Sequence, residues 1–309
     1  MGEFALSIGK ANFFTFGEVY DDEAKIAAFI GRHADQDGDI VGVDAALDFP
    51  LFFRLPGVAK GLSAPSQVAG VFEARKQIER NVISSHGEAG RYFVSFLDNH
   101  DQHDRFRYAD PAEPHRFDDQ VTLGLAWLFA LQGIPCLYYG TEQGLFGHGN
   151  TDGAVREALW GKPGAFDRAD PFYRAVQAIA KLRAGQPALR YGRQYVRPVS
   201  GDRRVFGVSA FSPGVLAFSR ILDEEEVVVV GNADTGAGVN LAVIVDAALN
   251  EAGARFDLLY SNKPVPGAPG AVEEIAGATV FEVDGRMSSG TVHAVSVTLG
   301  PCEVQVLAR

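Results

Sequence analysis

The chain has 309 residues, 47% of them hydrophobic, and a formal net charge of -11 at pH 7. A chain of this size and composition buries one large or two medium cores, which predicts a soluble globular protein of one or two domains. The acidic balance argues against a nucleic-acid surface and suits a neutral ligand such as a sugar. No uninterrupted apolar run reaches the roughly 18 residues that cross a bilayer, so no membrane span is expected.

The first residues are expected to be the end of a helix. The segment EFALSIGK, residues 3–10, has the pattern of the last turns of an amphipathic helix that Gly9 terminates. Met1 and Gly2 are followed by Glu3, without the basic region and apolar stretch of a signal peptide. The sequence leaves the compartment open, with the cytoplasm slightly favoured.

Up to residue 192, short apolar segments alternate with helical ones, as in βα units of a parallel sheet. The expected strands are residues 12–19, 43–49, 91–97 and 136–140. The expected helices are residues 22–32, 64–81, 117–132 and 171–184. Four βα units amount to half of an eightfold barrel.

From residue 193 onward the pattern becomes all β. Val295, Val297 and Leu299 alternate with small polar residues, which is typical of a strand that is half buried against a second sheet. We therefore expect two domains, a half barrel at 1–192 and an antiparallel β-sandwich at 193–309. The acidic run from Asp223 to Glu226 is expected to be a solvated hairpin turn.

Two carboxylates stand at the ends of predicted strands. Within ANFFTFGEVY a strand-like run ends at Glu18, and Asp101 follows YFVSFLDNH. Catalytic groups of a parallel barrel project from the C-terminal ends of its strands, so both residues are placed for chemistry. Each taken alone is better explained as a helix cap or a surface acid.

Four segments together resemble barrel strands five to eight of the α-amylase family of retaining glycoside hydrolases: FFTFGEVY, VDAALDFPLFF, FVSFLDNHD and GIPCLYYGTEQGL. They occur in the family's order and approximate spacing, and they cover roughly residues 4–192. The resemblance implies the C-terminal half of a (β/α)8 barrel, followed by the family's C-terminal β domain.

The resemblance implies that Glu18 is the general acid/base and that Asp101 stabilises the oxocarbenium-like transition state. It places Asn99, His100, Glu142 and Arg156 among the substrate-binding residues. For His100, a role in supporting the loop stays open, and for Arg156 an ion pair with Glu157 is an equal alternative. Tyr138 and Tyr139 are expected to pack in the core as part of a buried strand.

The family's nucleophile, an Asp two residues after an Arg at the end of strand four, has no counterpart here. GRHAD at residues 31–35 has the wrong spacing and follows a predicted helix, and Asp48 belongs to the sixth strand. Without a nucleophile the retaining mechanism cannot start. We therefore expect a fragment of a longer enzyme that is inactive alone.

A non-catalytic carbohydrate-binding or partner-binding subunit is the alternative function. The expected partners are an α-linked oligo- or polysaccharide and the missing N-terminal half of the barrel, with no nucleic acid and no membrane. No cofactor and no metal is assigned. Calcium in the family involves the missing portion, and Cys136 and Cys302 do not resemble a disulfide framework or a metal cluster.

Overall fold

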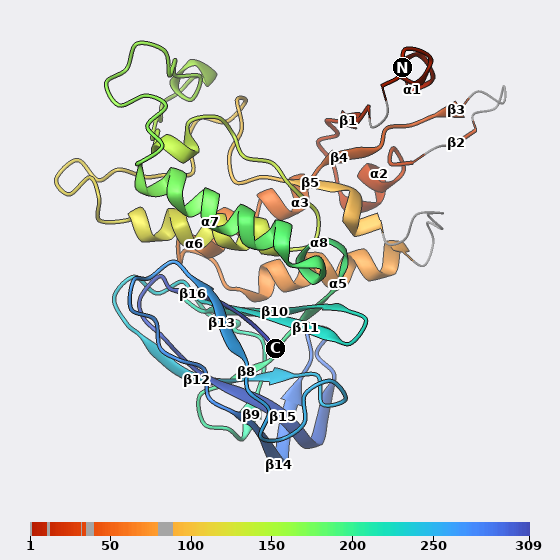
Figure 1. The fold of residues 1–309 in the computed structure, drawn as a ribbon, viewed down its shortest axis with the longest axis vertical. Coiled ribbons are helices and arrows are strands. Elements are labelled where there is room, and N and C mark those ends of the chain that lie inside the picture. The colour runs from red at the N-terminus through yellow and green to blue at the C-terminus, as the bar shows by residue number, and fades with distance from the viewer. Residues whose placement is uncertain (1, 11–12, 32, 35–39, 80–88) are drawn as a thin grey trace.

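The computed structural model describes residues 2–10, 13–31, 33–34, 40–79 and 89–309 (Figure 1). Its N-terminal part contains a parallel sheet in the order β1-β4-β5-β6, with every neighbouring pair parallel. The strands are β1 (Phe16–Gly17), β4 (Ala45–Leu47), β5 (Phe93–Ser95) and β6 (Ile134–Pro135). This order along one sheet is that of four consecutive βα units of a barrel.

Helices follow each of these strands in the chain, and α1 precedes the first strand. They are α1 (Gly2–Ser7), α2 (Glu23–Ala27), α3 (Phe49–Phe52), α4 (Leu55–Ala59), α5 (Ser66–Glu79), α6 (Asp118–Ala130), α7 (Pro171–Gly185) and α8 (Pro187–Tyr191). Three short 3₁₀ helices add to them: η1 (Ala89–Tyr92), η2 (Thr141–Gln143) and η3 (Asp152–Ala154). A small antiparallel pair, β2 (His33–Ala34) with β3 (Ile40–Val41), follows α2.

The long helices lie where the sequence predicts them, whereas the strands are shorter than expected. Asp170 caps α7 by accepting from the amide of Phe172, and Pro171 occupies the first turn, which fixes this start. The predicted helix 22–32 is too long, because α2 ends at Ala27 and Ile30 forms a β-bridge with Val43. Residues 80–81 of the predicted helix 64–81 lie outside the described residues.

The predicted strand at 136–140 is wrong. Pairing with β5 involves Ile134 and Pro135, and the amide of Cys136 donates the last hydrogen bond to Ser95. The chain then turns at Gly140, whose φ of 88° is in the left-handed region that favours glycine. Tyr138 and Tyr139 therefore belong to a loop and not to a buried strand.

The C-terminal part consists of two five-stranded sheets, in the orders β13-β16-β11-β10-β7 and β8-β12-β15-β14-β9. The strands of the first are β7 (Arg193–Val196), β10 (Val215–Leu222), β11 (Glu225–Asn232), β13 (Asp257–Ser261) and β16 (Val304–Ala308). Those of the second are β8 (Val199–Ser200), β9 (Val205–Phe206), β12 (Val239–Val245), β14 (Val272–Phe281) and β15 (Met287–Leu299).

A valine-rich core lies between these two sheets. Val228 and Val230 of β11 share one buried cluster with Val243 of β12 and Val295 of β15. Most strand pairs are antiparallel as expected, but β9 and β14 are parallel. Within the acidic run, Asp223 and Glu224 form the exposed β10–β11 hairpin turn as expected. Glu225 and Glu226 already belong to β11 and pair with β10, and Glu226 is buried.

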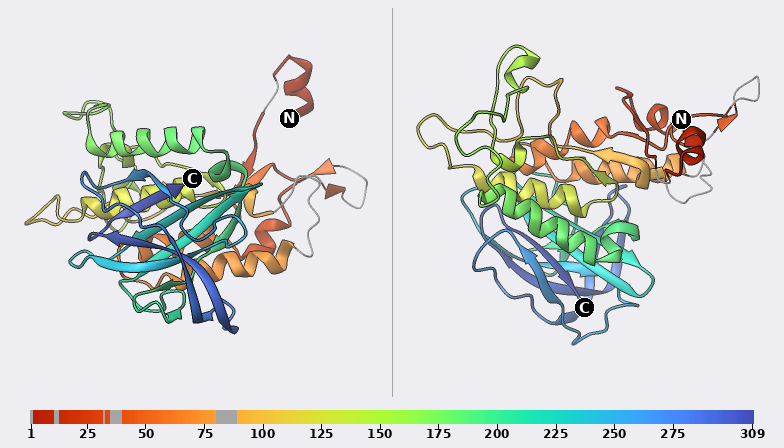
Figure 2. Two further views of the ribbon diagram at one scale, coloured as in Figure 1. Left: turned by 60° about the horizontal axis from the view of Figure 1, so that its bottom comes forward. Right: turned by 45° about the horizontal axis from the view of Figure 1, so that its top comes forward.

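The helices of the half barrel pack on the first of these sheets (Figures 1 and 2). Trp127 of α6 is fully buried at this junction, and a Cβ atom on Gly231 of β11 would lie 2.7 Å from the indole Nε1. Arg220 of β10 donates to the carbonyls of Ala130 and Gly192, both at 2.8 Å. The junction is therefore continuous with the core of the half barrel.

In the described part of the chain, no helix has the length and apolar character needed to cross a bilayer.

Candidate active site

The polar residues of interest follow the four parallel strands directly. Glu18 follows β1, Asp48 follows β4, and the segment Asp98 to Asp101 follows β5. The loop after β6 contains η2 and η3. Because the strands are parallel, their C-terminal ends lie at one edge of the sheet, where barrel enzymes place their catalytic groups. The loops after β5 and β6 project away from the β domain (Figure 1).

Asp101 is held by residues from two loops. Its Oδ1 accepts from Nη2 of Arg156 at 2.6 Å, and its Oδ2 lies 3.2 Å from Nε2 of His100. The side-chain oxygen of Asn99 accepts from the Asp101 amide at 2.9 Å. The structure thus brings three of the predicted site residues, Asn99, His100 and Arg156, into contact with a fourth, Asp101.

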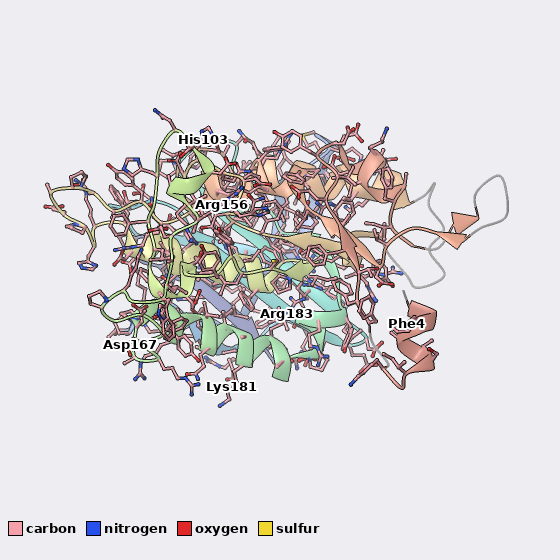
Figure 3. The ribbon with its side chains drawn as sticks, turned by 90° about the horizontal axis from the view of Figure 1, so that it is seen from above. Phe4, His103, Arg156, Asp167, Lys181 and Arg183 are labelled. Carbon is pink, nitrogen blue, oxygen red and sulfur yellow. The ribbon has the colours of Figure 1, made fainter. Side chains whose placement is uncertain are left out.

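Arg156 links the loops after β5 and β6. Besides Asp101, its Nε donates to the His100 carbonyl at 2.9 Å, and its Nη2 donates to Asp152 at 3.3 Å. Arg156 and His103 lie on the same side of the molecule in Figure 3, far from Phe4 of α1. The alternative of an ion pair between Arg156 and Glu157 is wrong, because Glu157 pairs with Arg105 and Lys162.

His100 and Glu142 have different surroundings. The His100 side chain is 54% exposed, so it is available to a ligand and is not buried inside the loop. The Glu142 carboxylate accepts from the amide of Gly140 at 2.8 Å, within its own turn. The structure therefore gives Glu142 a turn-stabilising contact and does not bring it to Asp101 through any described contact.

Glu18 is exposed just beyond β1. Among the described residues, no hydrogen bond or ion pair joins Glu18 to Asp101 or to any other group. The sheet order puts β4 between β1 and β5, so the two carboxylates are separated by one strand. Glu18 and Asp101 thus share an edge of the sheet without touching.

Asp48 has a structural role, in agreement with its rejection as the nucleophile. It is fully buried, and its carboxylate forms a salt bridge with the buried Arg75. It also accepts from the amide of Leu51 at 3.1 Å, as the N-cap of α3, and from the Ser95 hydroxyl at 3.1 Å. These contacts occupy both oxygens of the buried carboxylate.

Asp98 is a buried carboxylate to which the sequence analysis assigned no role of its own. Its Oδ2 accepts from the Phe106 amide at 2.9 Å, and the Thr141 hydroxyl donates to both oxygens at 3.2 and 3.3 Å. Burial raises the pKa of Asp98 above its ordinary value, against the lowering effect of these hydrogen bonds and of Arg105. Asp98 joins the end of β5 to the loop after β6.

Arg105 is a second residue of the site whose role no local sequence pattern indicates. It is buried, donates to Glu157 at 3.1 Å and to the Tyr139 carbonyl at 2.6 Å, and lies 4.2 Å from the Tyr138 ring centroid. The two tyrosine hydroxyls donate to the carbonyls of Val155 and Glu157. Together these contacts position the loop that contains Arg156.

No metal site accompanies these groups in the part of the chain that the structure describes: no cluster of three or more His, Cys, Asp or Glu is placed to hold an ion. Arg32 and Asp35 of the rejected GRHAD segment lie outside the described residues.

The family model of the α-amylase catalytic domain matches residues 2–192. The chain belongs to the α-amylase family. The match ends one residue before β7 begins, so it covers the part of the chain that precedes the two C-terminal sheets.

Known α-amylase-family proteins resemble the chain over much of its length. It is 30% identical over 193 residues to a cyclomaltodextrin glucanotransferase of Geobacillus stearothermophilus, covering 62% of this chain and 24% of that protein. It is 27% identical over 257 residues to an α-amylase of Streptomyces lividans, covering 75% of this chain and 26% of that protein. The chain thus spans about a quarter of the length of these curated relatives.

The fold is shared with solved members of the family. The α-amylase of Geobacillus thermoleovorans, crystallised with acarbose, superposes with a TM-score of 0.60 at 18% identity. The superposition covers 99% of this chain and 56% of that one. It supports a partial barrel followed by a β domain.

Proposed function

We propose that the chain supplies the acid/base and transition-state-stabilising half of a retaining site that hydrolyses or transfers α-linked glucans or oligosaccharides. The observation that carries the proposal is the placement of Glu18 and Asp101 at the C-terminal ends of β1 and β5 in one parallel sheet. The substrate class is supported by the relatives, which are named as amylases and cyclomaltodextrin glucanotransferases.

In this proposal Glu18 protonates the glycosidic oxygen while the bond to the anomeric carbon breaks. After a carboxylate nucleophile has formed the glycosyl-enzyme, Glu18 takes a proton from the attacking water or acceptor hydroxyl. Asp101 stabilises the positive charge that develops on the sugar, and His100 donates a hydrogen bond to the same sugar. Arg156 orients Asp101 through their 2.6 Å contact.

The nucleophile is proposed to come from another segment, the N-terminal half of a barrel. At the described strand ends, Asp48 is paired with Arg75 and Asp98 is buried under Phe106 and Thr141. Neither carboxylate is available for attack on an anomeric carbon. The isolated chain is therefore proposed to be inactive, and the open edges of β1 and β6 are where four further strands would pair.

Complementation tests this proposal. The purified chain is incubated with maltooligosaccharides, alone and after co-expression with the N-terminal half barrel of a family relative that contains the Arg-x-Asp strand end. We expect reducing sugar or transfer products only from the pair, and none when the chain has Glu18→Gln. Arg168→Gln, far from the strand ends in the sequence, is the matched control and should keep activity.

The same experiment decides against the alternative of a non-catalytic binding subunit. A pair that assembles and binds maltooligosaccharide but shows no turnover would favour that alternative. Turnover by the isolated chain that disappears in Glu18→Gln would show that the proposed origin of the nucleophile is wrong.

A further inference from the structure

A cavity lies at the junction of the half barrel and the β domain, and no step of the proposed reaction uses it. Its volume is about 250 Å³. We call it the junction cavity; residues that line it include Glu73, Lys76, Tyr195, Arg197, Glu282 and Arg286. We propose that the junction cavity binds the end of a neutral oligosaccharide, which, resting on the proposed function, is an α-linked glucan.

The walls of the junction cavity come from both parts of the molecule. One wall is α5, with Glu73 and Lys76. Ile244 of β12 and Val280 of β14 are apolar lining residues, and residues of the β14–β15 turn also line the cavity. The start of α5 is fixed to the β domain, because the Ser66 amide donates to the Ser209 carbonyl at 3.0 Å. The cavity is thus built by packed elements.

The positive charges around the junction cavity are compensated by carboxylates. Nζ of Lys76 lies 2.8 Å from Glu73, and Nε of Arg286 lies 2.6 Å from Asp284. Arg197 pairs at 2.6 Å with the buried Glu226. Among the described residues, every cation that lines the cavity therefore has a carboxylate partner. An anionic ligand would have to compete with these partners, which excludes a phosphate-type site on electrostatic grounds.

An apolar ligand fits no better, because it would remove paired charges from water without replacing their hydrogen bonds. A neutral polyhydroxylated ligand suits both the paired charges and the apolar side chains that line the cavity. Its hydroxyls donate to carboxylates and accept from ammonium and guanidinium groups, and its C–H faces pack on apolar side chains. The cavity volume of about 250 Å³ is below the roughly 300–1,000 Å³ of pockets that enclose whole ligands, so the cavity has room only for the end of a chain.

Tyr195 supplies an aromatic surface for such a ligand. It lies on β7, the edge strand of its sheet, and 38% of it is exposed. The Arg197 guanidinium lies 5.6 Å from the ring centroid, and Arg197 is itself fixed by Ser219 at 2.7 Å and by Glu226. The ring is therefore held before a ligand arrives, which lowers the entropic cost of binding.

Calorimetric titration with maltotriose tests the proposal. The full chain with Asp101→Ala is used as the background, so that binding at the strand ends is removed and the remaining signal reports the junction cavity. We expect saturable binding that Tyr195→Ala weakens by at least about tenfold and Tyr195→Phe leaves within about threefold, since the ring face makes the contact. Inorganic phosphate should not compete.

A second variant guards against a folding defect in Tyr195→Ala. Glu282 is exposed in the β14–β15 turn, and Glu282→Ala should weaken maltotriose binding several-fold while the melting temperature stays unchanged. Binding that is the same in the background and in both variants would overturn the proposal, as would no binding at all or competition by phosphate. Equal binding of cellotriose would overturn the α-glucan assignment. The binding measurements do not depend on turnover, so a failure of this proposal can be distinguished from a failure of the proposed function in the complementation experiment.

Discussion

Arg156 and Asp101 are joined by a 2.6 Å hydrogen bond between Nη2 and Oδ1, across 55 positions of sequence. Asp101 follows β5, whereas Arg156 follows η3 in the loop beyond β6. The same guanidinium also donates to the His100 carbonyl. One side chain thus fixes both the backbone and the carboxylate of the segment that contains the motif, which makes Arg156 a positioning residue for Asp101.

Arg156→Ala is expected to lower kcat of the complemented barrel by about tenfold, because a misplaced Asp101 stabilises the transition state less well. The free energy of unfolding should change by less than about 0.5 kcal/mol, since the pair is roughly half exposed. Steady-state kinetics and urea unfolding measure the two quantities. Arg174→Ala, on α7, is the matched control. A large loss of stability with unchanged kcat would contradict the positioning role.

The buried pair of Asp48 and Arg75 gives a test of stability. Arg75→Met removes the partner of a fully buried carboxylate, which is expected to cost about 3–5 kcal/mol of unfolding free energy. Adding Asp48→Asn should recover most of this loss, because asparagine keeps the N-cap of α3 without the charge.

Denaturant unfolding at pH 7 measures the three variants. Lys76→Met, whose exposed pair with Glu73 lies next to Arg75 in the sequence, is the control and should cost less than about 1 kcal/mol. If Arg75→Met and Lys76→Met cost the same, the buried pair is not a stabilising element.

Much of the architecture follows from local sequence, whereas the site contacts do not. The apolar pattern of α6 and the Asp170-Pro171 start of α7 are local signals, and both helices lie close to their predicted bounds. Strand ends depend on pairing partners, so the run up to Tyr139 looked like a strand although its pairing stops at Cys136. The order of the four strands came from the family resemblance.

The buried charges were not predictable, because their partners are also distant in the sequence. Glu226 belongs to an acidic run that is typical of a solvated turn, yet it accepts hydrogen bonds from Arg197 and Asn250, at 29 and 24 positions' distance. Arg105 and Asp98 likewise gain their roles from residues of the loop after β6. No spacing rule connects such partners.

The role of Glu18 as acid/base stays a prediction.

Asp98 makes stability depend on pH in a defined direction. Burial raises its pKa in the folded chain, so between the unfolded pKa near 3.8 and the higher folded value the folded state binds more protons than the unfolded state. The contribution of Asp98 to stability is therefore fully present below the unfolded pKa and is lost as pH rises through the folded pKa.

Asp98→Asn removes this titration while an amide oxygen still accepts from Phe106. We expect the unfolding free energy of the unchanged chain, measured relative to Asp98→Asn, to fall as pH rises from 4 to 7. Urea unfolding at four pH values checks the sign. A difference that is constant or that grows with pH would contradict it. Asp110→Asn is a useful comparison, because hydrogen bonds from Ala112 and Glu113 lower the pKa of Asp110 below 3.8. Its contribution to stability should therefore be nearly constant from pH 4 to 7 and should be lost only when the pH falls below about 4.

Arg220 is expected to couple the β domain to the half barrel. Its guanidinium is buried and donates to Ala130, at the C-terminal end of α6, and to Gly192, just after α8. Hydrogen bonds from a charged donor to buried carbonyls contribute about 1.5–3 kcal/mol each, and a helix C-terminus favours a cation. Arg220→Met keeps much of the volume and leaves both carbonyls without this donor. We expect a loss of about 3 kcal/mol or more in unfolding free energy, together with separation of one thermal transition into two.

Differential scanning calorimetry measures both effects. Arg203→Met, which removes an exposed pair with Glu273, is the control and should keep a single transition. A single, unshifted transition in Arg220→Met would show that the apolar contacts around Trp127 are sufficient to couple the two parts.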